Sequence, residues 1–156
     1  MKPDETALLH FNTGFNCAES VLMAVGEKLQ LDGFQAQRPA TGFGAGIAHQ
    51  GYVCGWLSGA TMAVGLAISR VDGSDEASKE LVYEIVGRIF ADFSKRLHVV
   101  ECRQLTGVDF HASDASPDEL QKVQRDVCGP LVSFVTLLTI AELKARGLPN
   151  RLPGTT

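Results

Sequence analysis

An uncharged stretch near the middle of the chain constrains the fold more than any other feature. From Gly42 to Ser69 the sequence contains no Lys, Arg, Asp or Glu. Small residues recur there at every fourth position, at Gly51, Gly55, Gly59, Ala63 and Ala67. Because positions four apart share one side of a helix, the pattern predicts a helix over 51–69 with one nearly bare face. Glycine inside a helix costs up to about 1 kcal/mol relative to alanine. We therefore expect either that another backbone approaches this face closely, or that a cofactor or reactive sulfur beside Cys54 needs the room.

The length of this segment raises the question of a membrane-spanning helix. A bilayer needs about 20 apolar residues, and small residues four apart also suit helix packing in membranes. The segment is nevertheless rich in Gly, Ser, Thr and Ala, and the chain has no second uncharged stretch of that length. We expect the buried central helix of a soluble bundle and no membrane span.

The composition is that of an ordinary globular protein. The chain has 156 residues, 45% of them hydrophobic, and a formal net charge of −4. This predicts one domain with a substantial core, and the acidic balance argues against a nucleic-acid partner. Met1 to Glu5 is polar and is not followed by the apolar run of a signal peptide. We expect a cytoplasmic protein, a setting in which cysteines are more often redox groups or metal ligands than structural disulfides.

Apolar residues recur at helical spacing through most of the chain and predict an all-α fold. Helices are expected at about 4–12, 17–30, 51–69, 75–98 and 127–145, with shorter helical pieces at 101–107 and from Ser116 onward. Asn16 and Glu19 form a capping-box pattern, and Ser116-Pro117 is a typical helix start. A loop is expected at 35–41 and a disordered tail at 150–156. The prediction is a single helical domain, residues 1–149, built as a bundle of five or six helices with the Gly-rich helix buried at its centre.

A glycine-rich run, Gly42-Phe43-Gly44-Ala45-Gly46, precedes the central helix. Such a run can bind phosphate when it joins a strand to a helix. Here it follows a loop that contains Gln, Arg and Pro, and no apolar strand precedes it. We therefore expect a tight turn or a closely packed helix in place of a nucleotide-binding loop.

Four cysteines, Cys17, Cys54, Cys102 and Cys128, are spread along the chain without a CxxC pair. Cys17 and Cys128 fall in the first turn of predicted helices, Cys102 at the start of a short one, and Cys54 early in the Gly-rich helix. The free N–H groups and dipole of a helix N-terminus favour a thiolate over a thiol, which makes the sulfur a better nucleophile or metal ligand. The alternative is that the cysteines are packed as small hydrophobic residues.

These cysteines and their surroundings resemble a family of proteins assigned a redox role and named for the pattern C…CGAxxG…C…C. The resemblance spans residues from about Gly14 to Val132. It is carried by Gly14-Phe15-Asn16-Cys17-Ala18, Gly42-Phe43-Gly44-Ala45-Gly46, Cys54-Gly55-Trp56-Leu57-Ser58-Gly59-Ala60, Cys102-Arg103-Gln104-Leu105-Thr106-Gly107 and Cys128. One position departs from the pattern, because Trp56 stands where the family has alanine.

The family resembles the non-haem portion of split-Soret cytochromes, which implies an iron–sulfur centre, such as [2Fe–2S], on the four cysteines. Cys17, Cys54, Cys102 and Cys128 are then the expected ligands of a cluster or of another thiophilic metal, in an electron-transfer protein with an unidentified redox partner. Two alternatives stay open. Two of the thiols could form a reversible disulfide, or the chain could be a non-enzymatic helical module whose cysteines only pack.

Two further expectations concern the surroundings of this site. His49, beside the glycine run, could add a fifth ligand, although a surface or capping role is more common for such a residue. The last predicted helix has apolar residues on more than one side, including Leu131, Phe134, Val135 and Leu138. This pattern predicts a homodimer, with burial of the same residues inside the bundle as the alternative.

Overall fold

The computed structural model describes residues 1–31, 37–112 and 114–149, and helices dominate them. The long helices are α1 (Pro3–Asn12), α2 (Cys17–Leu29), α4 (Gly55–Ile68), α5 (Glu76–Leu97) and α8 (Gly129–Lys144), and the short ones are α3 (Gln37–Ala40), α6 (Cys102–Thr106) and α7 (Pro117–Val123). Within the described ranges, the extended pairing is limited to one antiparallel bridge between Val53 and Glu101. The predicted all-α bundle is confirmed, while the tail expected at 150–156 lies outside the described residues.

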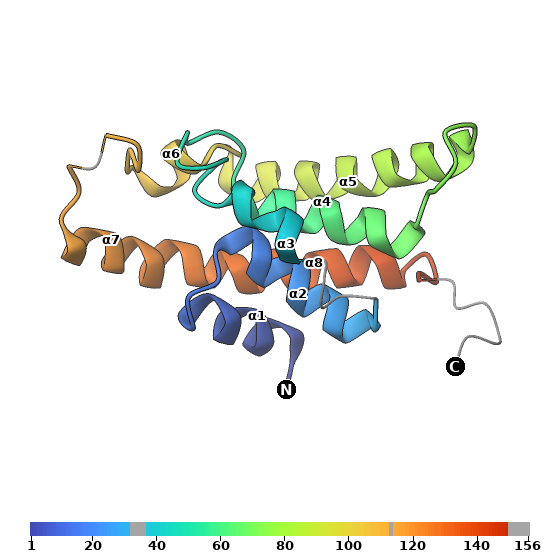
Figure 1. Cartoon of the computed structure of the whole chain (residues 1–156), viewed down its shortest axis with the longest axis horizontal. Helices are drawn as coiled ribbons and strands as arrows, with labels where there is room; N and C mark the ends of the chain where they lie inside the picture. The colour runs from blue at the N-terminus through green and yellow to red at the C-terminus, as the bar shows by residue number, and fades with distance from the viewer. Residues whose placement is uncertain (32–36, 113, 150–156) are drawn as a thin grey trace.

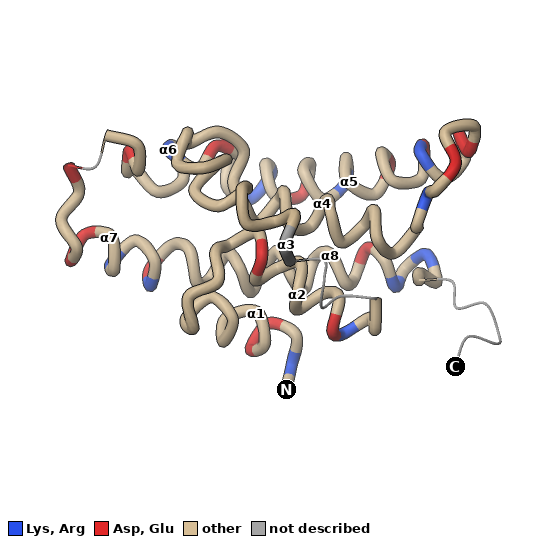
Figure 2. Tube along the Cα trace, viewed as in Figure 1, with Lys and Arg blue, Asp and Glu red and all other residues tan. Residues whose placement is uncertain are grey.

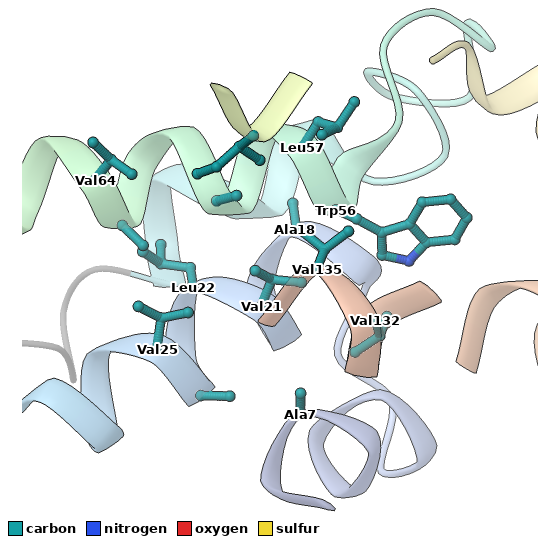
Figure 3. Close-up of a cluster of buried hydrophobic side chains, with 14 of the residues drawn as sticks. Ala7, Ala18, Val21, Leu22, Val25, Trp56, Leu57, Val64, Val132 and Val135 are labelled. Atoms are coloured by element: carbon teal, nitrogen blue, oxygen red, sulfur yellow. The ribbon is translucent and has the colours of Figure 1, made fainter. Parts of the chain in front are cut away.

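Two helices, α2 and α4, form the centre of the bundle. α2 packs against α1, α4 and α8, and α4 also contacts α5 and α8. In Figure 1, α5 runs along one side of the molecule and α1 lies on the opposite side, with α4, α2 and α8 between them. Figure 3 shows the aliphatic core that these helices share, which includes Val21, Leu22, Val25, Leu57, Val64, Val132 and Val135.

The uncharged sequence of α4 matches its central position. Figure 2 shows Lys, Arg, Asp and Glu residues on the other long helices, α2 included, and none along α4. A Cβ placed on Gly59 would overlap the carbonyl oxygen of Ala18, so the backbones of α4 and α2 are in direct contact there. This close approach is the compensation expected for glycine within the helix.

The start of the Gly-rich helix differs from the prediction. The helix begins at Gly55, with Cys54 as an extended N-cap, and Gly51 has a left-handed φ of +75°. The segment before α4 pairs instead with the chain ahead of α6, because the Cys54 N–H donates to the carbonyl oxygen of Val100 at 2.9 Å. This pairing satisfies backbone groups that a longer helix would have used, so the row of small residues is helical only from Gly55.

The start predicted for the last helix is also wrong. α7, a π-helical turn at Gln124–Cys128 and α8 form one continuous helix, Pro117–Lys144. Pro130 suggested a helix start, but the wide turn before it accommodates a proline whose ring would clash with the carbonyl four residues earlier in a regular helix. Of the part of the chain that the structure describes, this is the one helix that could cross a membrane by length and composition. Val132 and Val135 within it have no exposed surface.

The loop expected at 35–41 contains a helical turn. α3 covers Gln37–Ala40, and a 3₁₀ turn follows at Thr41–Phe43. The Ala40 side chain is fully buried in the core. Tertiary packing of this small residue, which local sequence does not reveal, accounts for the difference.

Candidate redox site

All four cysteines border one cavity. Its volume is about 1040 Å³, and Cys17, Cys54, Cys102 and Cys128 line it together with Trp56. Each cysteine is a free thiol, and none exposes more than 8% of its surface. The fold therefore brings the four sequence-predicted residues to one place, and their role as ligands stays a prediction.

Cys17 is the first residue of α2, and the capping box fixes its position. The Asn16 side-chain oxygen accepts hydrogen bonds from the N–H groups of Ala18 (3.0 Å) and Glu19 (3.1 Å). The Glu19 carboxylate accepts one from the Asn16 N–H at 2.8 Å. Asn16 Nδ2 also donates to the Thr41 carbonyl oxygen at 2.9 Å, and the Thr41 hydroxyl donates to Glu19 at 2.6 Å. The predicted capping box is thus confirmed, and it also ties the start of α2 to the segment that leads into the glycine run.

A short backbone pairing holds Cys54 beside Cys102. The Cys102 N–H donates to the Tyr52 carbonyl oxygen at 2.7 Å, and the Cys54 N–H donates to the Val100 carbonyl oxygen at 2.9 Å. The two thiols are in hydrogen-bond contact. Cys102 is the first residue of α6 and Cys54 caps α4, so Cys17, Cys54 and Cys102 lie at helix starts. This was predicted for Cys17 and Cys102, whereas Cys54 was expected within the Gly-rich helix.

Cys128 reaches the cavity from the interior of the long helix. It is the last residue of the π-helical turn, in which the Gly129 N–H donates to the Gln124 carbonyl oxygen. The position predicted for Cys128, in the first turn of a helix, is therefore wrong, for the reason given above for Pro130. The negative charges of Cys17 and Cys102 raise the pKa of Cys128, and no hydrogen bond to either residue contributes to that shift. Cys128 therefore stands apart from Cys54 and the two thiols that contact it, Cys17 and Cys102.

Gly55 leaves the space that the Cys17 sulfur occupies. A Cβ on Gly55 would overlap Cys17 Sγ and lie 3.0 Å from the Phe43 carbonyl oxygen. Gly59, one turn further along α4, is the point of backbone contact with α2. The bare face of α4 therefore has both of the roles that the sequence left open: it leaves room for a cysteine sulfur at Gly55 and allows close approach of another backbone at Gly59.

A left-handed turn supplies a further donor to Cys17. All residues from Ala45 to His49 have φ between +46° and +71°, a conformation that costs roughly 1–2 kcal/mol for each non-glycine residue. The Ala48 N–H donates to the Gly42 carbonyl oxygen at 3.0 Å and helps to hold the turn. The Ala45 N–H donates to the Cys17 sulfur. The glycine run thus forms the expected tight turn, and the strained backbone aims an N–H at a thiol.

Cys17 is the thiol best prepared to ionise. Its pKa is lowered to about 7, first because the Cys54 thiol donates to its sulfur, and then because the N–H groups of Ala45, Ala18 and Cys17 itself do so, while burial acts in the opposite direction. A thiol carries one hydrogen, so Cys54 can donate to only one neighbour at a time. The backbone donors lower the pKa of Cys17 whether Cys54 donates to Cys17 or to Cys102.

The other three thiols differ in their hydrogen bonds: Cys54 donates, Cys102 accepts, and Cys128 takes part in neither. Burial raises the pKa of Cys54 well above its ordinary range, and its hydrogen bonds to Cys102 and Cys17 act in the same direction. The Cys54 hydrogen bond lowers the pKa of Cys102 against the effect of burial. Burial raises the pKa of Cys128 to about 12, and the negative charges of Cys17 and Cys102 add to this. Near neutral pH Cys17 is therefore partly ionised, whereas Cys54 and Cys128 stay as thiols.

Trp56 is fully buried, and its indole nitrogen has no hydrogen-bond partner among the described residues. The ring packs against Phe93, with centroids 6.3 Å apart. Leaving a buried donor unpaired costs about 1–3 kcal/mol, and buried tryptophan N–H groups usually find a partner. The donor therefore marks a place in the site where an acceptor is missing.

The residues fit a thiophilic metal in donor type and in available room. Thiolates are the ligands of iron–sulfur clusters and of many zinc sites, and the four cysteines border a cavity of about 1040 Å³. Over the described ranges, no group of three or more His, Cys, Asp or Glu side chains is already arranged to hold a metal ion. The cysteine side chains would therefore rotate out of their contacts with one another when a metal binds. His49 also borders the cavity but is exposed, and its role as a fifth ligand stays a prediction.

Sequence reasoning missed part of the cavity wall. Phe11, Phe15 and Phe110 line the cavity, and the Ala45 N–H faces Cys17. Phe11 and Phe15 flank Gly14 beside the Asn16-Cys17 pair, which is a local signal that could have placed them at the site. No comparable signal exists for the Ala45 N–H, because its direction depends on a left-handed turn formed mostly by residues that rarely adopt one.

The fold and the cavity define an all-helical protein with four free thiols gathered at one site. Residues 15–141 match the family described as "Putative redox-active protein (C_GCAxxG_C_C)". The chain belongs to this family, which confirms the resemblance seen in its sequence. When the final glycine of the printed motif GCAxxG is matched to Gly59, its alanine falls on Trp56, and its first two letters, Gly-Cys, fall on Cys54-Gly55 in the opposite order. No curated protein and no solved structure matches the chain.

Proposed function

We propose that the protein transfers electrons through an iron–sulfur cluster, or another thiophilic metal centre, bound by Cys17, Cys54, Cys102 and Cys128. The observation that carries the proposal is that four buried thiols from four separate segments border one cavity. Four cysteines are the common ligand set of [2Fe–2S] and [4Fe–4S] clusters. Membership of a family with a redox role supports the same assignment.

In this proposal the cysteines bind the metal centre and the aromatic residues around them shield it. The bound group supplies one-electron chemistry. The Cys54 thiol, together with the Ala45 and Ala18 N–H groups, lowers the pKa of Cys17 to about 7, so Cys17 is the first ligand ready to bind. Cys54 and Cys128 lose their protons on binding, since a metal ligand must be deprotonated. Phe11 and Phe15 line the cavity and limit the access of water to the sulfurs.

The test is anaerobic purification followed by a visible spectrum and by iron and acid-labile sulfide analysis per chain. We expect a visible chromophore, and its loss or severe weakening when each of the four cysteines is changed to serine. Gly65→Ala is the matched control on α4, because a Cβ there meets nothing within 4 Å. An iron-free, colourless protein after anaerobic reconstitution would contradict the proposal.

A second candidate, a thiol–disulfide redox protein, is favoured by the contact of Cys54 with both Cys17 and Cys102. The Cys17 thiolate would attack one sulfur of a substrate disulfide, form a mixed disulfide and release the other substrate sulfur as a thiolate. Cys54, after losing its proton, would attack the Cys17 sulfur and release the second substrate thiolate. Two protein thiols are then oxidised to one disulfide, and the substrate disulfide gains two electrons.

Oxidised glutathione is a suitable probe for this second candidate. We expect the metal-free protein to lose two of its four thiols, with a Cys17–Cys54 or Cys54–Cys102 disulfide in the peptide map. Cys54→Ser should trap the mixed disulfide on Cys17, whereas Cys128→Ser should leave the reaction intact. Retention of all four thiols after the treatment would argue against this function.

A further inference from the structure

The unpartnered donor of Trp56 lies at the candidate redox site. Trp56 is the second residue of α4 and follows Cys54 by two positions, and it borders the same cavity as all four cysteines. Its side chain has no exposed surface, and Nε1 has no hydrogen-bond partner in the described part of the chain. In Figure 3 the indole ring extends away from the aliphatic cluster around Val21.

Bulk water does not account for the missing acceptor. Nε1 has less than 1 Å² of accessible surface, so a water molecule cannot reach it from the open part of the cavity. The ring packs on Phe93, and Leu57 and Ala60 on the same helix are also buried, so the donor cannot swing out to solvent. An acceptor can therefore reach Nε1 only if side chains of the site move.

The cysteine sulfurs are the acceptors that can move there. In the metal-free arrangement they contact one another, and none of them accepts from Nε1. On metal binding the thiols would lose their protons and their contacts with one another, and their sulfurs would become negatively charged. Sulfur that is bound to a metal and carries negative charge is an acceptor for N–H donors, and such hydrogen bonds help to set the potential of the centre.

We propose that the Trp56 Nε1–H donates a hydrogen bond to a sulfur of the loaded centre, either a cysteine thiolate or an inorganic sulfide, and raises its reduction potential. The proposal rests on the proposed iron–sulfur function. The hydrogen bond stabilises the reduced form more than the oxidised form, because reduction increases the negative charge on sulfur. Alanine, the third letter of the motif in the family description, has no side-chain donor, so the proposed hydrogen bond depends on Trp56.

Removing the donor should lower the reduction potential. For Trp56→Phe we expect the ratio of oxidised to reduced protein at a fixed potential to rise about tenfold, a shift of about 59 mV for a one-electron couple. Trp56 is the single tryptophan of the chain, so an isostere with sulfur in place of the indole nitrogen can be incorporated at this position alone. The isostere keeps the bicyclic shape and removes only the donor. Gly65→Ala is the control on the same helix, because a Cβ there meets nothing within 4 Å, and it should leave the potential near that of the parent.

A second measurement reports on the hydrogen bond itself. The vibrational band of the indole N–H, recorded by ultraviolet resonance Raman spectroscopy, comes from one residue and can be compared before and after loading. We expect a weakly bonded N–H in the metal-free protein and a stronger hydrogen bond in the loaded protein. A parent that gains no visible chromophore overturns both this inference and the proposed function. A parent with a chromophore, but with the same potential in the isostere variant and the same N–H band on loading, overturns this inference alone.

Discussion

The contact between α4 and α2 at Gly59 gives a stability prediction that can be worked out from the structure. In Gly59→Ala the new Cβ would overlap the Ala18 carbonyl oxygen and lie 3.1 Å from the Ala18 Cα and carbonyl carbon. These are backbone atoms of α2 and cannot rotate away. The two helices must therefore separate locally, in a region where Leu22 and Leu57 are almost completely buried.

The expected cost combines two opposing effects. Overpacking a well-packed core costs about 1–3 kcal/mol, and we take the upper end because the overlap is with backbone. Replacing glycine by alanine inside a helix returns up to about 1 kcal/mol. The net expectation for Gly59→Ala is a loss of about 2 kcal/mol in the free energy of unfolding, and Gly59→Leu should lose more.

Gly65 provides a matched control on the same helix. A Cβ there meets nothing within 4 Å, so Gly65→Ala should gain up to about 1 kcal/mol from helix propensity. Urea unfolding of the reduced, metal-free proteins, followed by circular dichroism, measures both variants under one condition. If the two alanine variants prove equally stable, the close approach of α4 and α2 at Gly59 is wrong.

Four more predictions concern the site and the surface. Asn16→Ala should cost about 1 kcal/mol in urea unfolding, whereas Asn16→Asp, which keeps the acceptor, should cost less. In reduced, metal-free protein, alkylation of Cys17 should have its pH midpoint at about 7, and Cys54→Ala should move that midpoint upward; an unchanged midpoint would remove Cys54 as the main cause. Because folding lowers the Cys17 pKa from 9.0, the stability it contributes is complete above pH 9.0 and is lost as the pH falls through about 7. Light scattering at micromolar concentration should give a dimer mass, and a monomer mass would contradict the interface predicted on the last helix.

The helices that the sequence predicted are those with local start signals. Asn16 and Glu19 form the capping box that starts α2, and Ser116 caps α7 as expected. The apolar spacing of α5 predicted a helix at 75–98, and the structure has Glu76–Leu97. In these cases the same few neighbouring residues decide both the pattern and the structure, so local sequence is sufficient.

The features that escaped prediction depend on contacts between distant segments. The bridge between Val53 and Glu101 shortens the Gly-rich helix, and neither residue signals the other in the sequence. The left-handed turn at 45–49 is formed mostly by residues that prefer a right-handed backbone. Pro130 suggested a helix start because proline is common in the first turn of a helix. The π turn that accommodates it inside a longer helix cannot be recognised from composition. The four candidate cysteines were identified from the sequence, and only the fold could show which of them touch.

The spacing of Gly55 and Gly59 connects the core to the chemistry of the site. Both glycines lie on the face of α4 that meets the start of α2: Gly59 sets how closely the helices approach, and Gly55 leaves the gap that the Cys17 sulfur fills. The Ala18 carbonyl that contacts Gly59 belongs to the same residue whose N–H supports the Cys17 thiolate. A change in the distance between the helices therefore alters the donors around Cys17 as well as the packing of the core. The small residues that first indicated a buried helix therefore also leave room for the Cys17 sulfur in the core beside that helix.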